Sequence, residues 1–425
     1  MNRLSIILLS VLAMACHSKK ETITNPADYA AFLEINSENE KLKLAEKELT
    51  FWSEKFEKSP NQTPYLIKMA AANNALFEQK GDINYLVSAE NQLIRANEMA
   101  GSKSASQLRA LAKTHITQHK FREALCALQK ADSLGEGKLA TQMMLFDVNM
   151  ELGNYDKAEA FLTGQRETET FNYLIRLAKW HDYEGDTQGA IDQLQRALQK
   201  AEEMKSEPLK LWTYSNLGDY YGHVGNIEKS YEYYLKTLAI DPHYDYALKG
   251  IAWIVFSYER NPEEAERIIK VLQKRHEAPD YQLLLAEIAE FRGNEEAKAR
   301  HINNFLATVS SPSYGDMYNA YLVTLLENEP EKALELAKKE VINRPTPQSY
   351  QLLSYASMLN GRGEEALKLA DQYVNGKTFE PVSLYQLATV YKKSGRGKEV
   401  EELKKELMGA YFEVGPLMEK EIEKL

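Results

Sequence analysis

The chain has 425 residues, of which 52 are Lys or Arg and 62 are Asp or Glu, so its formal net charge at pH 7 is −10. This acidic balance argues against a nucleic-acid partner, because phosphate binding needs a basic stripe and the sequence has no dense Lys/Arg block. It also argues against electrostatic adhesion to an anionic membrane. Hydrophobic residues make up 44% of the chain, which suits a packed chain without a disordered domain.

Residues 1–15 have the features of a secretion signal: a positive residue, an apolar stretch and then small residues. The stretch is too short to span a bilayer stably. Its end at Cys16, before polar residues 17–21, resembles a bacterial lipoprotein signal. That resemblance implies lipid modification of Cys16 as the membrane anchor, with residues 16–25 as a flexible lipidated tether. An ordinary signal peptide cleaved near Ala15, leaving Cys16 free, is the alternative.

Cys126 is the second of two cysteines in the chain. If Cys16 carries lipid, Cys126 has no disulfide partner, so packing alone has to hold an exported chain of this size. Because Cys126 stands among Ala and Leu residues of a helical stretch, we expect it to be a small residue of the core.

Residues 26–60 predict N-terminal capping helices. Pro26 suits the first turn of a helix, and an apolar face at helical spacing follows, made of Leu42, Ala45, Leu49, Trp52 and Phe56. The Ser59-Pro60 pair ends it. A helix of this kind can cover the exposed end of a repeat array.

Small residues then recur with a mean step of about 35 residues, which indicates stacked repeats. They are Ala89, Ala124, Ala158, Ala190, Ser230, Ala265, Ala297, Ala333, Ala366 and Val400. Glycines at equivalent turns form a second series: Gly153, Gly185, Gly225, Gly293, Gly361 and Gly395. Prolines between units form a third: Pro242, Pro279, Pro312, Pro345 and Pro381. Each unit is therefore predicted to be two amphipathic helices joined by a tight turn.

The unit between Trp212 and Pro242 carries the most complete pattern: Leu217-Gly218, Tyr221, Ser230, Tyr234, Thr237 and Pro242. At this spacing the chain resembles the tetratricopeptide family over residues 61–409. The resemblance implies an all-α fold, a right-handed α-solenoid of about ten stacked helix-turn-helix repeats with helical caps. Residues 410–425, which contain a Gly-Pro break, are expected to form the C-terminal capping helix.

The same resemblance implies which residues line the concave groove of the solenoid. They are Asn172, Lys179, Asp182, Tyr183, Trp212, Ser215, Asp219, His223, Lys249, Trp253 and Phe256. Aromatic residues beside a few charged groups are typical of binding surfaces. For Trp253 and Phe256, packing against the next repeat is an equal alternative.

The sequence has only weak signals for a metal site or a catalytic site. His115 and His119 stand four apart on one predicted helix, but they coincide with the aromatic and turn positions of their repeat, so we interpret them as structural and expect no metal site. The sequence has no phosphate-binding Gly-rich loop and no nucleophile motif. No catalytic activity and no cofactor are expected.

These observations favour a non-catalytic, lipid-anchored scaffold that binds a protein or peptide in its groove. The expected place is the bacterial cell envelope, at the outer membrane. The alternative is a surface lipoprotein that captures glycans or nutrients with the same kind of helices. Such proteins carry long insertions between repeats, whereas the repeat steps here leave no room for one.

Overall fold

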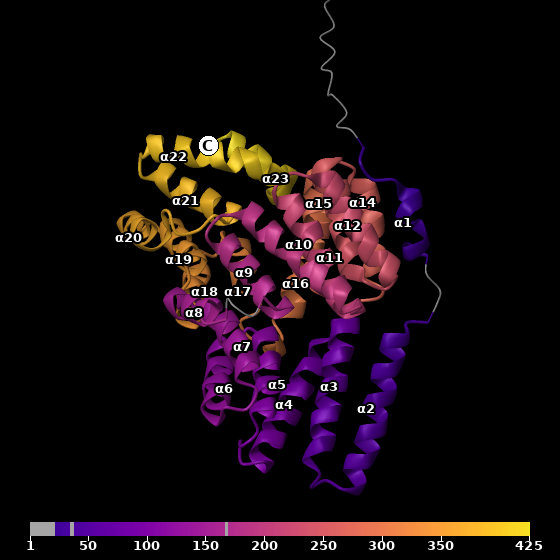
Figure 1. Cartoon of the computed structure of the whole chain (residues 1–425). Helices are drawn as coiled ribbons and strands as arrows, with labels where there is room; N and C mark the ends of the chain where they lie inside the picture. Colours follow the sequence, from indigo (N-terminus) through magenta and orange to yellow (C-terminus); the bar gives the residue numbers. More distant parts are fainter. Residues whose placement is uncertain (1–21, 35–37, 166–168) are drawn as a thin grey trace, which may run out of the picture.

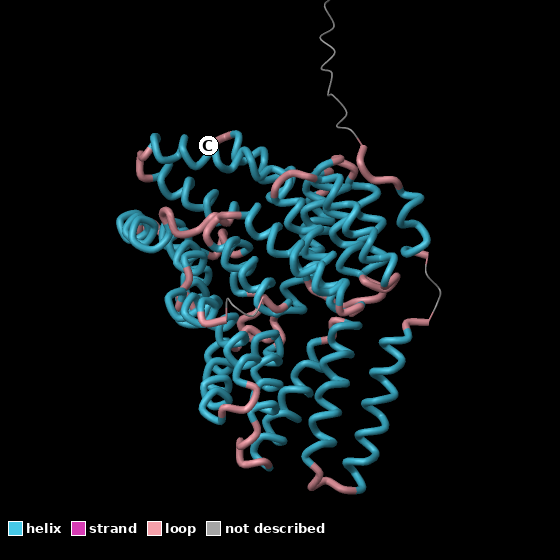
Figure 2. The backbone as a smooth tube through the Cα atoms, viewed as in Figure 1, coloured by secondary structure: helices cyan, strands magenta, loops and turns pink. Residues whose placement is uncertain are grey.

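The computed structural model describes residues 22–34, 38–165 and 169–425. In this part of the chain every regular element is a helix and no strand is present (Figure 2). The expected signal segment 1–15 and the anchor Cys16 lie outside the described residues. No helix among the described residues combines the length and the apolar character that crossing a membrane requires.

Ten helical hairpins follow one another in the described ranges, and the two helices of each pack against each other (Figure 1). Hairpins 1 to 5 are α3 (Thr63–Lys80) with α4 (Ile83–Met99), α5 (Ala105–Thr117) with α6 (Phe121–Leu134), α7 (Lys138–Glu151) with α8 (Tyr155–Thr163), α9 (Phe171–Tyr183) with α10 (Thr187–Glu203), and α11 (Glu207–His223) with α12 (Ile227–Ile240). The predicted all-α array of stacked hairpins is confirmed.

Hairpins 6 to 10 continue the array. They are α13 (Asp245–Trp253) and its π-helical extension η2 (Ile254–Tyr258) with α14 (Pro262–Leu272), α15 (Asp280–Phe291) with α16 (Glu295–Val309), α17 (Asn319–Leu325) with α18 (Pro330–Asn343), α19 (Pro347–Leu359) with α20 (Gly363–Leu369) and its extension η4 (Ala370–Val374), and α21 (Pro381–Lys393) with α22 (Gly397–Leu407). Two short 3₁₀ turns, η3 (Pro312–Tyr314) and η5 (Met408–Ala410), lie between helices.

The periodic small residues occupy the second helix of each hairpin, as the period predicts. All of them except Ala297 are buried. In hairpin 4, Ala178 of α9 and Ala190 of α10 are both buried in one cluster with Leu194. Small side chains at these positions let the two helices approach closely while Leu194 fills the space beside them.

The predicted turn glycines have left-handed backbone, with φ between 67° at Gly153 and 79° at Gly185. Gly153 also shows why only glycine fits. A Cβ atom there would lie 2.6 Å from the carbonyl oxygen of Pro345. The turn of hairpin 3 therefore touches the loop between α18 and α19, far along the chain.

Contacts of this kind recur, because the second half of the array folds back onto the first (Figure 1). The carbonyl of Lys80, at the turn of hairpin 1, accepts a 2.7 Å hydrogen bond from the amide of Glu277. The ring of Phe379 lies against Gly185, at the turn of hairpin 4. Successive early turns thus meet successive later loops. The concave groove expected from the sequence is therefore bordered by these later loops of the same chain.

Helix α1 (Pro26–Leu33) is placed differently from the expectation, since it does not cap the start of the array. Its Tyr29 is fully buried in the core of hairpins 5 to 7, and the Tyr29 hydroxyl donates a 2.8 Å hydrogen bond to Glu264 of α14. The amides of Ile23 and Thr24 donate to Oε1 of Glu259 at 2.9 and 2.6 Å. Residues 23–25, predicted to belong to a flexible tether, are therefore bound to the solenoid.

The two ends of the array are covered by other helices. Helix α2 (Glu40–Lys58) packs along α3 of hairpin 1. Helix α23 (Tyr411–Glu423) bends at Gly415, where φ is 79° and ψ is 173°. Its Val414 and Ile422 pack on Leu384 and Leu407 of hairpin 10.

Candidate partner-binding surface

The predicted groove residues lie on the first helices of hairpins 4, 5 and 6. In α11, Trp212, Ser215, Asp219 and His223 recur every three or four residues, so they share one face of the helix. His223, at the end of this row, forms an ion pair with Glu413 of α23, with 2.9 Å between Nδ1 and Oε2. This contact places the row on the enclosed inner side of the array.

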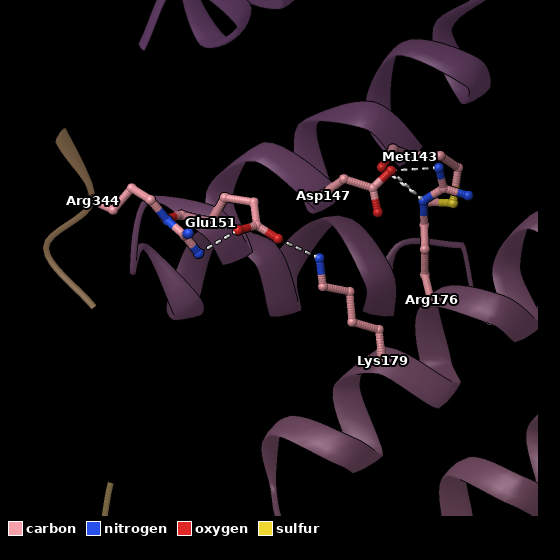
Figure 3. Close-up of polar contacts among 6 residues, drawn as sticks. All are labelled: Met143, Asp147, Glu151, Arg176, Lys179 and Arg344. Carbon is pink, nitrogen blue, oxygen red and sulfur yellow. Dashed lines mark hydrogen bonds and ion pairs between the residues drawn. The ribbon is translucent and has the colours of Figure 1, made fainter. Parts of the chain in front are cut away.

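Lys179 belongs to a charged network between α7, α9 and the loop before α19 (Figure 3). Its ammonium lies 2.8 Å from Oε1 of Glu151, and Oε2 of Glu151 accepts a 2.6 Å hydrogen bond from Arg344. One helical turn earlier, Asp147 accepts from Arg176 at 2.6 Å. The network thus has three cations and two carboxylates, and its excess positive charge lies at the inner surface of hairpins 3 and 4.

Burial and ion pairing act against each other in this network. Burial would raise the pKa of Glu151, but Lys179 and Arg344 outweigh it and hold that pKa below its usual value. Burial raises the pKa of Asp147, which Arg176 compensates only in part. For Lys179, burial would lower the pKa, yet Glu151 and Asp147 raise it. Lys179 is therefore a paired cation with 40% of its side chain still open to solvent.

Three other predicted groove residues of α9, Tyr183, Asp182 and Asn172, also contact groups of the same chain. The ring of Tyr183 stacks on Tyr155, with 4.1 Å between ring centroids. Asp182 keeps part of its surface exposed. The surrounding protein raises the pKa of its carboxyl, and this shift is opposed by His223 and by a hydrogen bond from Tyr220. Asn172 is exposed, and its backbone carbonyl accepts a 2.9 Å hydrogen bond from Arg176.

Asp219 accepts two phenol hydrogen bonds, from Tyr234 at 2.6 Å and from Tyr246 at 2.8 Å. Burial raises its pKa, and the two phenol donors oppose this shift. The Tyr246 ring is 47% exposed, and the ammonium of Lys249 lies 5.4 Å from its centroid. Trp212 is 36% exposed. Tyr246, which the sequence did not assign to the groove, thus joins the predicted residues Asp219 and Lys249, and Trp212 lies two turns before Asp219 on the same face of α11.

Three predicted groove residues are not available to a partner. Ser215 is 2% exposed and Phe256 is fully buried. Trp253 is half-buried and donates its Nε1–H to the backbone carbonyl of Phe412, at 3.0 Å. For Phe256 the alternative prediction, packing against the next repeat, is confirmed, and the groove position is not. Phe256 lies in η2, where the i to i+5 hydrogen bonding of a π turn changes the register, and its ring packs edge-on against Phe291, 5.5 Å away.

Other residues singled out from the sequence have plain structural surroundings. His115 lies 3.2 Å from Glu90, whereas His119 stacks on Phe121 at 5.3 Å. The described residues hold no group of His, Cys, Asp and Glu suited to a metal ion. Cys126 is exposed, so its assignment to the core is wrong. It lies on the side of α6 opposite to Ala124 and Leu128, and these two residues are buried in the core.

The structure adds residues that the repeat pattern does not assign to the surface. They are Asp147, Glu151, Arg344, Phe412 and Glu413. Asp147 and Glu151 stand four apart on α7, a helix with many buried apolar residues, and this charged pair was the available signal in the sequence. For Arg344, Phe412 and Glu413 no such signal existed, because their partners lie far away along the chain.

The fold places the chain in the class of tetratricopeptide-like helical-repeat solenoids. No family model and no curated protein sequence matches it. Among solved structures, it is similar to a human IFIT1 dimer with PPP-AAAA, at 14% identity and a TM-score of 0.48, over 73% of this chain and 72% of that one. Yeast Tom70 is similar at 12% identity and a TM-score of 0.40, over 91% and 93% of the two chains. YrrB, described as a TPR protein with an unusual peptide-binding site, is similar at 20% identity and a TM-score of 0.27, over 46% of this chain and 95% of YrrB.

Proposed function

We propose that this protein is a non-catalytic scaffold that binds a protein or peptide partner on the inner face of hairpins 4 to 6. The observation that carries the proposal is the exposed Tyr246, which donates to Asp219 and lies beside Lys249, together with the exposed Trp212 on the same face of α11 as Asp219. Rigid aromatic residues next to charged groups bind with little loss of side-chain entropy. The contacts between the early turns and the later loops favour a segment of polypeptide over a large folded surface.

The proposal includes attachment to the bacterial envelope, at the outer membrane, by lipid on Cys16. The apolar run that ends at Cys16 supports it. Replacing Cys16 with Ala is expected to abolish incorporation of a labelled fatty acid and to move the protein out of the membrane fraction. Membrane association that is unchanged in the Cys16→Ala variant would contradict the anchor.

The binding site is tested with the full chain and envelope extract. A Trp212→Ala/Tyr246→Ala double variant is expected to capture the partner at least tenfold less efficiently than the unchanged protein, with helical content retained. The matched control is Leu44→Ala/Phe51→Ala, which removes two exposed apolar side chains from α2. Equal capture by the inner variant and the unchanged protein would overturn the assignment of the inner face.

A further inference from the structure

The C-terminal segment Tyr411–Pro416 is seated against the first helices of three consecutive hairpins. It contacts α11 of hairpin 5, η2 of hairpin 6 and α15 of hairpin 7. These helices belong to the middle of the array, whereas the segment follows directly after the last hairpin. Its contacts there differ from those of an end cap.

The backbone of the segment is held through one carbonyl group. The Phe412 oxygen accepts a 3.0 Å hydrogen bond from Trp253 Nε1 and a 2.6 Å hydrogen bond from Ser257 Oγ. Ser257 is buried, with 1% of its surface exposed. Two side-chain donors from hairpin 6 thus converge on a single main-chain acceptor, which is the way proteins recognise a peptide backbone.

Two side chains of the segment are also matched by the inner face. The ring of Phe412 lies over Gly222, where a Cβ atom would come within 2.7 Å of Cε1. Glu413 pairs with His223 at 2.9 Å. Burial would lower the pKa of His223, but the pair with Glu413 outweighs it and the pKa is raised. The inner face therefore accommodates an aromatic ring followed by a carboxylate.

The backbone at the bend, Gly415, packs closely against side chains of hairpins 6 and 7. A Cβ atom there would meet Glu287 Oε1 and the indole of Trp253, each at 2.8 Å. The left-handed φ of 79° also favours glycine. Beyond the bend, Glu419 accepts from Arg260 of hairpin 6. An aromatic-acidic pair followed by glycine thus fits the surface of hairpins 5 to 7.

The segment shares one residue, Val414, with the cap of hairpin 10, whereas Phe412 and Glu413 take no part in that cap. The cap is made by Val414 and Ile422 on Leu384 and Leu407. Phe412 and Glu413 point instead to hairpins 5 and 6, so capping does not require them. Removing them leaves the apolar contacts of the cap in place.

Resting on the proposed function, we propose that the inner face of hairpins 5 to 7 is a docking site for peptides with an aromatic-acidic pair followed by glycine, and that residues 411–416 occupy this site as an internal ligand. A partner has to displace the internal segment. Because the segment is tethered to its site, it competes at a high effective concentration. The observed affinity for a partner equals the affinity of the open site multiplied by the fraction of molecules in which the internal segment has left the site.

The test uses a fluorescent peptide with the sequence of residues 408–419, added to the full chain. Phe412→Ala/Glu413→Gln in the chain weakens the internal segment and leaves the docking site intact. This variant is expected to bind the peptide at least tenfold more tightly than the unchanged chain. Adding Trp253→Phe and His223→Gln, which remove the donors of the site, is expected to abolish the gain.

Hydrogen exchange gives a second readout of the same variants. Amides 411–415 are expected to exchange faster in Phe412→Ala/Glu413→Gln and in His223→Gln, while α21 and α22 keep their protection because Ile422 still packs on Leu384 and Leu407. The matched control is Glu421→Gln in the same helix, whose carboxylate pairs with exposed Lys424 and which is expected to change neither readout.

Equal peptide binding by the unchanged chain and the weakened variant would overturn the docking site, and so would a gain that survives loss of Trp253 Nε1 and His223. Unchanged exchange at 411–416 in the weakened variant would have the same meaning. Each of these three results leaves the proposed function standing if the Trp212→Ala/Tyr246→Ala variant still captures less partner. The experiments therefore distinguish failure of the internal-ligand proposal from failure of the proposed function.

Discussion

Arg344 donates a 2.6 Å hydrogen bond to Glu151 across 193 residues of sequence. It comes from the loop before α19, and Glu151 ends α7. The contact therefore joins hairpins 8 and 9 to hairpin 3 and helps to hold the array closed. Glu151 keeps a second cation, Lys179, at 2.8 Å.

Replacing Arg344 with Met is expected to lower the free energy of unfolding by about 1–3 kcal/mol, since a charged hydrogen bond is lost while Lys179 still compensates Glu151. The array is also expected to open, which small-angle X-ray scattering measures as a larger radius of gyration. Arg292→Met is the control, because Arg292 is 42% exposed in its pair with Glu266, and its loss is expected to cost less than about 1 kcal/mol. Equal effects of the two variants would refute the role of Arg344 in closure.

Glu90 provides a prediction for acid conditions. A hydrogen bond from His115 and the ion pair with Lys120 lower its pKa from 4.5 to about 2, although burial opposes the shift. Because the folded state holds this proton more weakly than the unfolded chain, the stabilisation is complete above pH 4.5 and is lost as the pH falls towards 2. Glu90→Gln is expected to be less stable than the unchanged protein by roughly 1–3 kcal/mol at pH 7.

Urea unfolding at a series of pH values measures this difference. It is expected to shrink steadily between pH 4.5 and pH 2. A difference that stays constant over the whole range would show that Glu90 acts through packing rather than through its charge.

The repeat period, the turn glycines and the helix-crossing residues were predictable because each depends on contacts within one hairpin or between neighbours. Ala190 and Gly225 have only local requirements, and the structure meets them. Closure of the array was not predictable. It depends on small rotations accumulated over many hairpins, and no local pattern links Arg344 to Glu151.

The inner surface was predictable in the same limited way. Lys179 and His223 contact Glu151 and Glu413, and Asp219 accepts from Tyr234, at positions that the repeat register of α9 and α11 fixes. Of the two alternatives for Phe256, packing against the next repeat holds, and Phe256 lies in the π turn η2, which changes that register. The docking of α1 on hairpins 5 and 6 was missed because the partner of Tyr29, Glu264, is 235 residues away in the sequence.

The Tyr234 ring lies between two glycines of neighbouring helices and provides a packing prediction. A Cβ atom on Gly218 or Gly250 would come within 2.6 or 2.3 Å of the ring. Gly250→Ala is therefore expected to destabilise the protein by about 1–3 kcal/mol, since an extra methyl group has to displace a buried side chain. Thermal unfolding measures the change.

Gly397→Ala is the matched control. Gly397 also lies in a helix, but a Cβ atom there has no neighbour within 4 Å, so alanine is expected to be neutral or slightly stabilising. A loss of stability at Gly397 equal to that at Gly250 would mean that contact with Tyr234 does not set the cost.

Glu287 lies beside Gly415, and burial, with a smaller effect of Glu290, raises its pKa from 4.5 to about 8. The folded state therefore binds this proton more tightly than the unfolded chain does. As the pH rises from 4.5 to 8, ionisation is favoured only on unfolding, so the free energy of unfolding falls. The slope contributed by this one group is at most about 1.4 kcal/mol per pH unit.

Glu287→Gln removes this titration and keeps the shape of the side chain. The variant is expected to match the unchanged protein below pH 4.5 and to exceed its stability increasingly up to pH 8, in urea unfolding at fixed ionic strength. Because a Cβ atom on Gly415 would meet the Glu287 carboxyl, exchange of amides 411–415, corrected for its intrinsic pH dependence, is expected to accelerate between pH 6 and pH 8 in the unchanged protein but not in the variant. Parallel stability profiles for the two proteins would show that the Glu287 carboxyl is ionised in the folded state and that the contact with Gly415 does not depend on its proton.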